Sequence, residues 1–506
     1  DSTTPSFLHS EVQMTFLLPL FASTALAGDF MDVWVTTALE DDNLRAGPEH
    51  YSPTANFVSR GNRTFFEDYE ARYSDDISQS HLVLYRKDDG FFENWYTETA
   101  MVLQFRPYLD PDQSTDGVNL TDDGSYVRLV RELPGENHNV SLTGYAIDAS
   151  RFRLGYSYDL SYGGREIMAR PVWAMPGARV QWQHGNTYAF AGAKSAIGPR
   201  TELEWEGDRN SSYYGFLAGA GTRIGENLLL EAGTGLFQQG QLENVPDAGS
   251  PLYGEMIQAM GVSAQAGWRT SENIDFIQSA ELRLYRNAPE HMRDSYISHT
   301  TSDGVDVLVQ AEANYLVHNL LNADKSDETI LENAMSADLQ TVIAFGDMAL
   351  NVDAVYKDLA YILFNIPGLT SGTSLPQDLT TTPQLYGRLR FSHYLPKQHF
   401  AWTLGAGMMQ PATYTTEDGG TFVQYTERDK EGVPTNQDGA SNILAGIAGV
   451  QVDLSKSTVA VGELLYTMDN NLSRVQANES GDLVRVAEPS EVTSALGFNL
   501  MLRSRF

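Results

Sequence analysis

The chain has 506 residues, no cysteine and a formal net charge of −32, because 66 Asp and Glu outnumber 34 Lys and Arg. The lack of cysteine excludes disulfides, thiolate metal sites and thiol catalysis. The acidic balance argues against nucleic acid as a partner. With 42% apolar residues, the chain is long enough for several soluble domains or for one large barrel.

The first concentrated apolar stretch runs from Met14 to Ala27, where Ala25-Leu26-Ala27 has the small-x-small form of a signal-peptidase site. We therefore expect residues 1–28 to be a signal peptide with an upstream extension, cleaved near Ala27. No apolar run reaches the roughly 18 residues that a membrane-spanning helix needs. Export without such a helix leaves the periplasm, the outer membrane or the medium as destinations.

Beyond residue 30 the dominant pattern is a strict alternation of apolar and polar residues. Successive side chains of a strand lie on opposite faces, so each such segment predicts a strand with one apolar face. Their 9 to 13 residues match a tilted membrane-crossing strand. The clearest segments are Met31 to Leu39, one near Leu82, Arg151 to Asp159, Ile274 to Arg286, Val305 to Tyr315 and Asp347 to Lys357.

Short and long connections alternate along the chain. Short turns are predicted at 222–227, 396–398 and 455–457, and long polar loops at 107–124, 240–254, 287–304, 321–334, 365–383, 411–441 and 469–490. This asymmetry is typical of barrels with short turns on one side of a membrane and long loops on the other, and we predict about 18 strands, within a range of roughly 16 to 22.

Residues 40–80 break the pattern, since this segment is charged yet rich in Phe and Tyr and contains no predicted strand. A loop of this length in a compact domain calls for an explanation. Two interpretations stay open: a surface loop, which we favour, or a plug segment that folds inward as a constriction.

The last 15 residues form one predicted strand that ends on an aromatic residue. Its apolar face carries Phe498, Leu500 and Leu502 and ends at Phe506, while its other face is mostly polar. This strand resembles the closing strand of Gram-negative outer-membrane β-barrel proteins, porins and export channels among them, which the insertion machinery reads as a signal. Ser504 departs from that pattern, because an apolar residue is usual at its position.

The resemblance implies an all-β fold over residues 29–506: a closed antiparallel transmembrane β-barrel with short periplasmic turns and long extracellular loops. It also implies an integral protein of the outer membrane of a Gram-negative bacterium. The expected partners are outer-membrane lipid and lipopolysaccharide, the barrel-assembly machinery during insertion, and periplasmic or lipoprotein partners. Acidic loops suit bridging to lipopolysaccharide through divalent cations, although a solubilising charge explains them at least as well.

If the apolar faces meet lipid, the charged faces line the lumen. The predicted basic strip is Arg128, Arg151, Arg153, Arg179, Arg388 and Arg390. The predicted acidic strip is Glu202, Glu204, Glu281, Asp306, Glu312 and Asp353. On roughly opposite arcs, the two strips would create a transverse field across a water-filled channel. The alternative is that these groups pair across or along the wall in a packed lumen.

The favoured function is therefore an outer-membrane channel for passive passage or export of polar or charged solutes. One rival is a structural barrel of an envelope-spanning complex for polysaccharide export or gliding motility, with a narrow or plugged lumen; a rim-active hydrolase is the less favoured rival. We find no HExxH, GxSxG or P-loop motif, so no enzyme, catalytic residue or cofactor is predicted. Acidic loops such as Thr121-Asp122-Asp123-Gly124 have the composition of calcium ligands but miss the EF-hand spacing, so solvated turns are favoured over Ca²⁺ or Mg²⁺ sites.

Overall fold

The structure is a computed structural model, and it describes residues 31–41, 44, 77–108, 117–122, 124–149, 152–155, 174–199, 210–242, 250–276, 302–325, 327–364, 372–417, 419–425, 430–478, 480 and 482–505. Outside these residues lie the predicted signal peptide over 1–28, the cleavage site near Ala27 and most of the 40–80 segment. The same holds for Arg151, Glu202, Glu204, Glu281 and Phe506.

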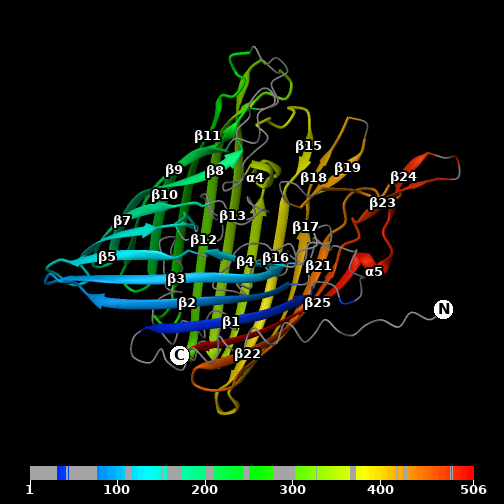
Figure 1. The fold of residues 1–506 in the computed structure, drawn as a ribbon. Coiled ribbons are helices and arrows are strands. Elements are labelled where there is room, and N and C mark those ends of the chain that lie inside the picture. The colour runs from blue at the N-terminus through cyan, green and yellow to red at the C-terminus, as the bar shows by residue number, and fades with distance from the viewer. Residues whose placement is uncertain are drawn as a thin grey trace.

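The described residues form a closed antiparallel β-barrel of 18 strands (Figure 1), which confirms the predicted fold class and strand number. The first half of the wall consists of β1 (Asp32–Asp41), β2 (Ile77–Asp89), β3 (Trp95–Tyr108), β4 (Gly117–Asp122), β5 (Tyr126–Glu132), β6 (Asn139–Tyr145), β7 (Gly177–His184), β8 (Thr187–Pro199), β9 (Asn210–Ile224) and β10 (Leu228–Gln241). The second half consists of β11 (Met256–Arg269), β12 (Ser302–Leu321), β13 (Thr329–Gly346), β14 (Met348–Lys357), β16 (Gln384–Leu395), β17 (Phe400–Gln410), β21 (Ile443–Asp453), β22 (Thr458–Met468) and β25 (Ser494–Arg505). Both β4 and β5 pair with β3, one after the other, so they share one position in the wall.

The barrel closes where β25 pairs with β1. Thr36 lies opposite Arg503 in this pairing, and the Arg503 Nε donates a 3.2 Å hydrogen bond to the Thr36 hydroxyl. Nearer the end of the chain, Arg505 Nη2 lies 2.9 Å from Asp32 Oδ1. These contacts join residues from the two extremes of the described chain, as a closed wall without free edges requires.

The two faces of the wall differ as the sequence predicts. In β11, burial alternates residue by residue: Gln265 and Arg269 are buried, whereas Trp268 is exposed on the outer face. In β25, Leu500 and Leu502 lie exposed on the outside. Ser504 shares their face, but its hydroxyl lies 3.1 Å from that of Thr458 on β22, so a neighbouring strand accounts for the polar residue there.

Most connections at one end of the barrel are short, and we call this the short-turn end. They comprise 90–94, 133–138, 185–186, 225–227, 347, 396–399 and 454–457. The short turns predicted at 396–398 and 455–457 are confirmed, and the one predicted at 222–227 shortens to 225–227 because β9 runs to Ile224. The exception is 270–301, between β11 and β12, at the same end. We had expected its second half, 287–304, to be one of the long loops of the other end. In barrels of this type the short turns face the periplasm.

The opposite, long-loop end carries small elements that the sequence patterns missed. A four-stranded sheet combines β15 (Thr380–Thr382), β18 (Ala412–Thr415), β19 (Thr421–Gln424) and β20 (Lys430–Gly432), and a hairpin combines β23 (Ser473–Ala477) and β24 (Leu483–Ala487). The hairpin projects away from the barrel (Figure 1). The loops predicted at 411–441 and 469–490 therefore contain strands, 107–124 contains β4, and 321–334 shortens to 322–328 because β12 and β13 are longer than predicted.

The helices are few and short among the described residues: α4 (Leu359–Phe364), α5 (Ser490–Thr493) and the 3₁₀ turn η2 (Pro396–Gln398). Within the described ranges, no helix is long and apolar enough to cross a membrane.

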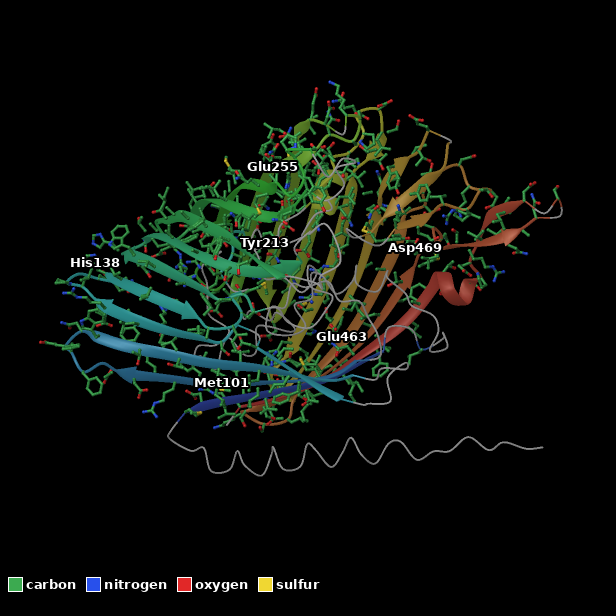
Figure 2. All side chains as sticks on the ribbon, turned by 45° about the horizontal axis from the view of Figure 1, so that its top comes forward. Met101, His138, Tyr213, Glu255, Glu463 and Asp469 are labelled. Atoms are coloured by element: carbon green, nitrogen blue, oxygen red, sulfur yellow. The ribbon has the colours of Figure 1, made fainter. Side chains whose placement is uncertain are left out.

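The apolar core of the protein lies inside the barrel. Its largest cluster contains lumen-facing residues of many strands, among them Val83, Val102, Tyr213 and Leu316, together with Tyr361 from α4. Side chains cover both faces of the wall (Figure 2), with His138 at the short-turn end and Asp469 towards the long loops. The lumen is therefore not lined by charged groups alone.

Candidate functional site: the charged lumenal wall

Charged side chains are buried on the lumenal face of the wall. Among the described barrel residues, the buried basic ones are Arg128, Arg179, Lys194, Arg269, Lys357, Arg388, Arg390 and Arg503. The buried acidic ones are Glu98, Glu231, Asp306, Glu312, Asp338, Asp353 and Glu463. The strand register places all of them opposite other inward-facing residues. The buried charges of the described lumen are therefore nearly balanced, although the chain as a whole is strongly acidic.

The charges are grouped along the circumference. Basic residues predominate on β5 to β8, where Arg128, Arg179 and Lys194 lie, and acidic residues predominate on β10 to β14. These two arcs are neighbours, separated by β9 alone. They do not face each other across the lumen as we had expected, because the strands that carry them follow closely in sequence and adjacent strands pair in order.

Buried opposite charges pair along the wall, as two examples show. Arg128 Nη1 lies 3.1 Å from Glu98 Oε2, on directly opposite residues of β3 and β5. Arg388 Nε donates a 2.9 Å hydrogen bond to Asp353 Oδ2, again between directly opposite residues, on β14 and β16. All four side chains are nearly inaccessible, so each pair is an interior ion pair with little solvent screening.

The structure places several members of each predicted strip on the lumenal face. Arg128, Arg179, Arg388 and Arg390 face the lumen, as do Asp306, Glu312 and Asp353. The described arginines of the basic strip do not lie together, however: β5 and β7 lie far around the wall from β16, which carries Arg388 and Arg390 beside the acidic strands. Arg153 lies outside the barrel strands. Eight of the buried lumenal charges are in neither predicted strip, Glu98 and Arg269 among them, although each continues the inward face of its strand.

A segment between β6 and β7 packs against the lumenal wall. We predicted a barrel strand over Arg151 to Asp159, but residues 152–155 belong to no strand of the wall. Phe152 and Leu154 are fully buried and lie over lumenal glycines. A Cβ on Gly192 would come within 2.7 Å of Phe152 Cε1, and one on Gly233 within 2.7 Å of Leu154 Cδ2. The alternating pattern is the same for apolar side chains that pack on an inner wall and for those that face lipid.

At the long-loop end, α4 contributes to the core inside the barrel. Tyr361 and Phe364 of this helix belong to the lumenal apolar cluster, and the Phe364 carbonyl accepts a 3.1 Å hydrogen bond from Gln239 Nε2 on β10. The Gln239 Oε1 lies 2.7 Å from His318 Nδ1 on β12. The connection between β14 and β16 therefore narrows the lumen from this side.

A third inward-packing segment, Ser271–Phe276, follows β11 at the short-turn end. A strand was predicted over Ile274 to Arg286, but its described part, 274–276, is not a strand. Ile274 and Phe276 are instead buried in a cluster with the lumen-facing Leu229, Leu308, Val342 and Ala344. A Cβ on Gly267, also lumenal, would come within 2.7 Å of Phe276 Cδ1, so this glycine makes room for the ring.

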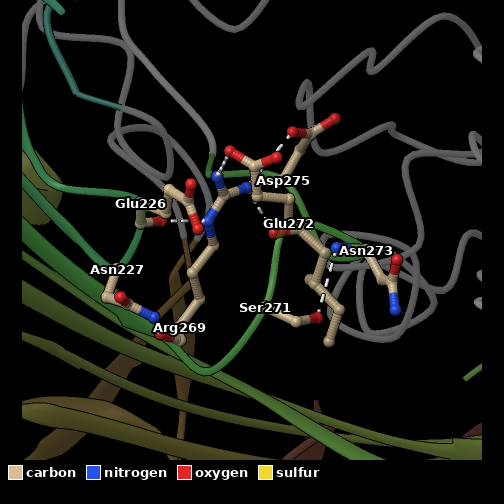
Figure 3. Close-up of polar contacts among 8 residues, drawn as sticks. Glu226, Asn227, Arg269, Ser271, Glu272, Asn273 and Asp275 are labelled. Atoms are coloured by element: carbon tan, nitrogen blue, oxygen red, sulfur yellow. Dashed lines mark hydrogen bonds and ion pairs between the residues drawn. The ribbon is translucent and has the colours of Figure 1, made fainter. Parts of the chain in front are cut away.

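Arg269, the last residue of β11, binds this segment and the neighbouring turn at once (Figure 3). Its Nε donates to the Glu226 carbonyl at 2.7 Å, and its Nη1 donates to the Ile274 carbonyl at 2.9 Å. The guanidinium also lies 3.6 Å from Glu272 and 3.4 Å from Asp275, and 4.8 Å from the centre of the Phe276 ring.

A second polar contact holds the segment to β12. Asn273 Nδ2 donates a 2.8 Å hydrogen bond to Asp306 Oδ2, and Asp306 is largely buried on the lumenal face. One predicted acidic-strip residue thus binds an inward-folded segment of the same chain. At this end of the lumen, Arg269 and Asp306 are engaged in holding protein structure.

Aromatic residues mark the membrane boundary at the short-turn end. Trp182, Trp268 and Trp402 lie on the outer face near the short turns. The ring centroids of Trp402 and Phe391 are 5.4 Å apart. Rings at such positions are partly exposed to water and partly in contact with lipid, as is usual for aromatic residues at the membrane interface. Tyr188, Phe190 and Tyr213, in contrast, turn into the lumen and belong to the core.

Two carboxyl groups just beyond the strands at the long-loop end are perturbed by burial. Burial raises the pKa of Asp358, although its carboxylate accepts hydrogen bonds from the backbone N–H groups of Tyr361 and Met335. Burial likewise raises the pKa of Asp469, which accepts a 2.7 Å hydrogen bond from the Tyr425 hydroxyl. Both groups stabilise local loop structure.

The predictions about metals rest on loops that are only partly described. Asp122 accepts hydrogen bonds from the backbone N–H groups of Ser125 and Asp148, so it acts as a turn-forming residue. Among the described residues, no group of three or more His, Asp or Glu side chains is placed to hold a metal ion.

Comparisons with known proteins add no family assignment. No family model matches the sequence, and no curated protein matches it. Solved structures with a similar fold include OccAB3 of Acinetobacter baumannii (7% identity, 94% of this chain and 98% of that chain covered, TM-score 0.46). They also include OccD3 (OpdP) of Pseudomonas aeruginosa (9%, 94% and 90%, 0.46) and its outer membrane protein opdK (9%, 94% and 98%, 0.43). These likenesses are too distant to assign a substrate or a mechanism.

The strand pairing and the two faces define the class of protein by themselves. A closed antiparallel barrel with an apolar outer face, aromatic residues at its boundary and charged residues inside is the architecture of integral outer-membrane proteins of Gram-negative bacteria. The protein is an outer-membrane β-barrel.

Proposed function

We propose that the protein is an outer-membrane channel for polar or charged solutes. The observation that carries this proposal is the combination of 18 strands with a charged inner wall. An eight-stranded barrel can be filled by its own wall side chains, whereas one of about 16 to 18 strands encloses an aqueous channel unless further segments fill it. Charged wall residues favour water and polar solutes in that space.

The near balance of lumenal charge sets the expected selectivity. Neighbouring basic and acidic arcs attract opposite ends of a dipolar solute, while a balanced wall discriminates little between small cations and anions. We therefore expect passage of polar solutes with weak ion selectivity. The inward-packing segments at both ends and on the wall narrow the path, so the expected conductance is below that of an empty barrel of this size.

The narrowing also favours a second candidate function, a structural or assembly barrel with a blocked lumen. The large apolar cluster inside the barrel supports this alternative. Single-channel recording of the refolded protein in a planar bilayer, with a salt gradient, separates the two. Stable ohmic steps with weak selectivity support the channel; silence from protein that is verified as folded contradicts it and favours the structural barrel.

Arg390 provides a variant that tests the wall itself. It faces the lumen beside the acidic strands, and Arg390→Gln should shift the reversal potential in a salt gradient towards cation selectivity. Lys397→Gln is the matched control, because Lys397 is an exposed cation in the turn between β16 and β17. Equal reversal potentials for both variants would contradict a conducting path along this wall.

A further inference from the structure

We infer that Ser271–Phe276 is a plug segment in the short-turn mouth of the barrel, and that Arg269 is the positioning residue that holds it there. The inference deepens the proposed channel function, on which its electrical consequence rests. Connections at this end are otherwise short, and this one starts by folding back into the lumen rather than crossing to the next strand.

The plug segment is anchored by burial of its apolar side chains. Ile274 and Phe276 lie among lumen-facing residues of β10, β12 and β13, three strands that line one side of this mouth. Gly267 leaves a space on β11 that the Phe276 ring occupies. A surface turn would leave two such apolar residues exposed, so their burial requires the segment to lie inside the wall.

Arg269 is suited to hold this segment because its guanidinium is nearly inaccessible to solvent and makes its contacts within this mouth of the barrel. It binds one carbonyl outside the segment, that of Glu226, and one within it, that of Ile274. The fixed fork of the guanidinium lets one side chain join both, which a lysine ammonium does less well. The arginine thus connects the β9–β10 turn to the plug segment.

The plug segment also has a salt-sensitive part. Glu272 and Asp275 pair with Arg269, but about half or more of each acidic side chain is exposed to solvent. Salt screens such exposed pairs, while it leaves the buried backbone contacts of the same arginine largely intact. Salt alone is therefore expected to loosen the plug segment without releasing it.

The test uses the absence of cysteine in the chain. Ile274→Cys introduces a single thiol at a buried position and keeps the backbone carbonyl that Arg269 binds. Its modification by a water-soluble maleimide is measured in the folded barrel, alone and combined with Arg269→Gln. Loss of one charge-assisted contact should speed modification about tenfold or more. Lys397→Gln, which removes a cation from another turn at the same end, should leave the rate unchanged.

Bilayer recordings of the same proteins give the second readout. Arg269→Gln should raise the conductance or the open time. The values for Arg269→Lys should lie between those of Arg269→Gln and those of the unmodified protein. Should Arg269→Gln fail to fold, Glu272→Gln with Asp275→Asn replaces it, with faster labelling at low salt as the expected result. Faster labelling without current supports the plug segment and contradicts the channel. Equal labelling with and without Arg269, whatever the current, overturns the inference.

Discussion

The buried pair of Glu98 and Arg128 offers a direct measure of how dry the lumenal wall is. Glu98→Gln removes the carboxylate that lies 3.1 Å from the guanidinium and leaves the arginine charged. Both side chains are at least nine-tenths buried, so water cannot easily replace the lost partner. The change preserves shape and volume, which isolates the effect of charge.

The expected loss of stability is large. Breaking a buried ion pair by removing one partner costs about 3–5 kcal/mol, because an uncompensated charge remains inside. Replacing both residues with leucine removes the charges together and is expected to cost far less, since a buried pair contributes little net stability. Glu98→Leu, Arg128→Leu and the variant that carries both therefore form a cycle with a strong coupling term.

Urea unfolding of the barrel refolded into lipid vesicles provides the assay. With an m value of about 3 kcal/mol/M, Glu98→Gln should lower the midpoint by about 1 M or more. Glu132→Gln is the matched control, because Glu132 is exposed in the same pair of strands, and we expect its effect to stay within about 0.5 kcal/mol. If Glu98→Gln behaves like this control, the pair is hydrated and the description of a dry wall on β3 and β5 is wrong.

Three further predictions test other parts of the structure. Gly192→Ala would place a Cβ against the Ala178 carbonyl oxygen and should destabilise the barrel by about 1–3 kcal/mol in the same unfolding assay, whereas Gly387→Ala, with open space at its Cβ, should be neutral. Leu500→Lys on the outer face should cost up to about 2–4 kcal/mol, and Leu500→Met, which keeps an apolar side chain there, clearly less; equal losses would contradict the assignment of this face to lipid. Because the pKa of Asp358 is raised in the folded protein, its contribution to stability is fully present below the unfolded pKa and is lost as pH rises through the folded pKa. Amide exchange of α4 should accordingly accelerate with rising pH beyond the intrinsic rate change, and Asp358→Asn should abolish this extra dependence.

Sequence patterns predicted the wall well because lipid on one side and water or protein on the other impose opposite polarities on adjacent residues. The strands around Val305 to Tyr315 and Asp347 to Lys357 were found for this reason, and so was the closing strand. Alternation failed at Phe152 and Ile274, where the apolar residues pack on the inner wall instead of facing lipid. Nothing local distinguishes these two environments.

For the candidate site, the sequence predicted which way the charged side chains face but not which residues they contact. Inward orientation followed from alternation for Arg128, Arg388 and Asp353, but their partners did not, because pairing depends on the register between strands. The two predicted arcs proved to be neighbours because the strands that carry them follow closely in sequence and pair in order. The role of Arg269 requires the fold-back of the segment after it, which is a tertiary feature without a local signature.

The seam between β1 and β25 has a consequence for how the barrel forms. Every other pairing in the wall joins strands that are close in sequence and can form as soon as the chain between them exists. The seam joins residues 467 and 473 positions apart, such as Thr36 with Arg503 and Asp32 with Arg505. Closing a loop of that size costs about 5 kcal/mol of chain entropy, which falls severalfold once the intervening hairpins hold the ends near each other. β25, the last of the described wall strands in sequence order, therefore completes a nearly finished wall, and until it docks the first strand keeps an open edge that is able to pair with other chains.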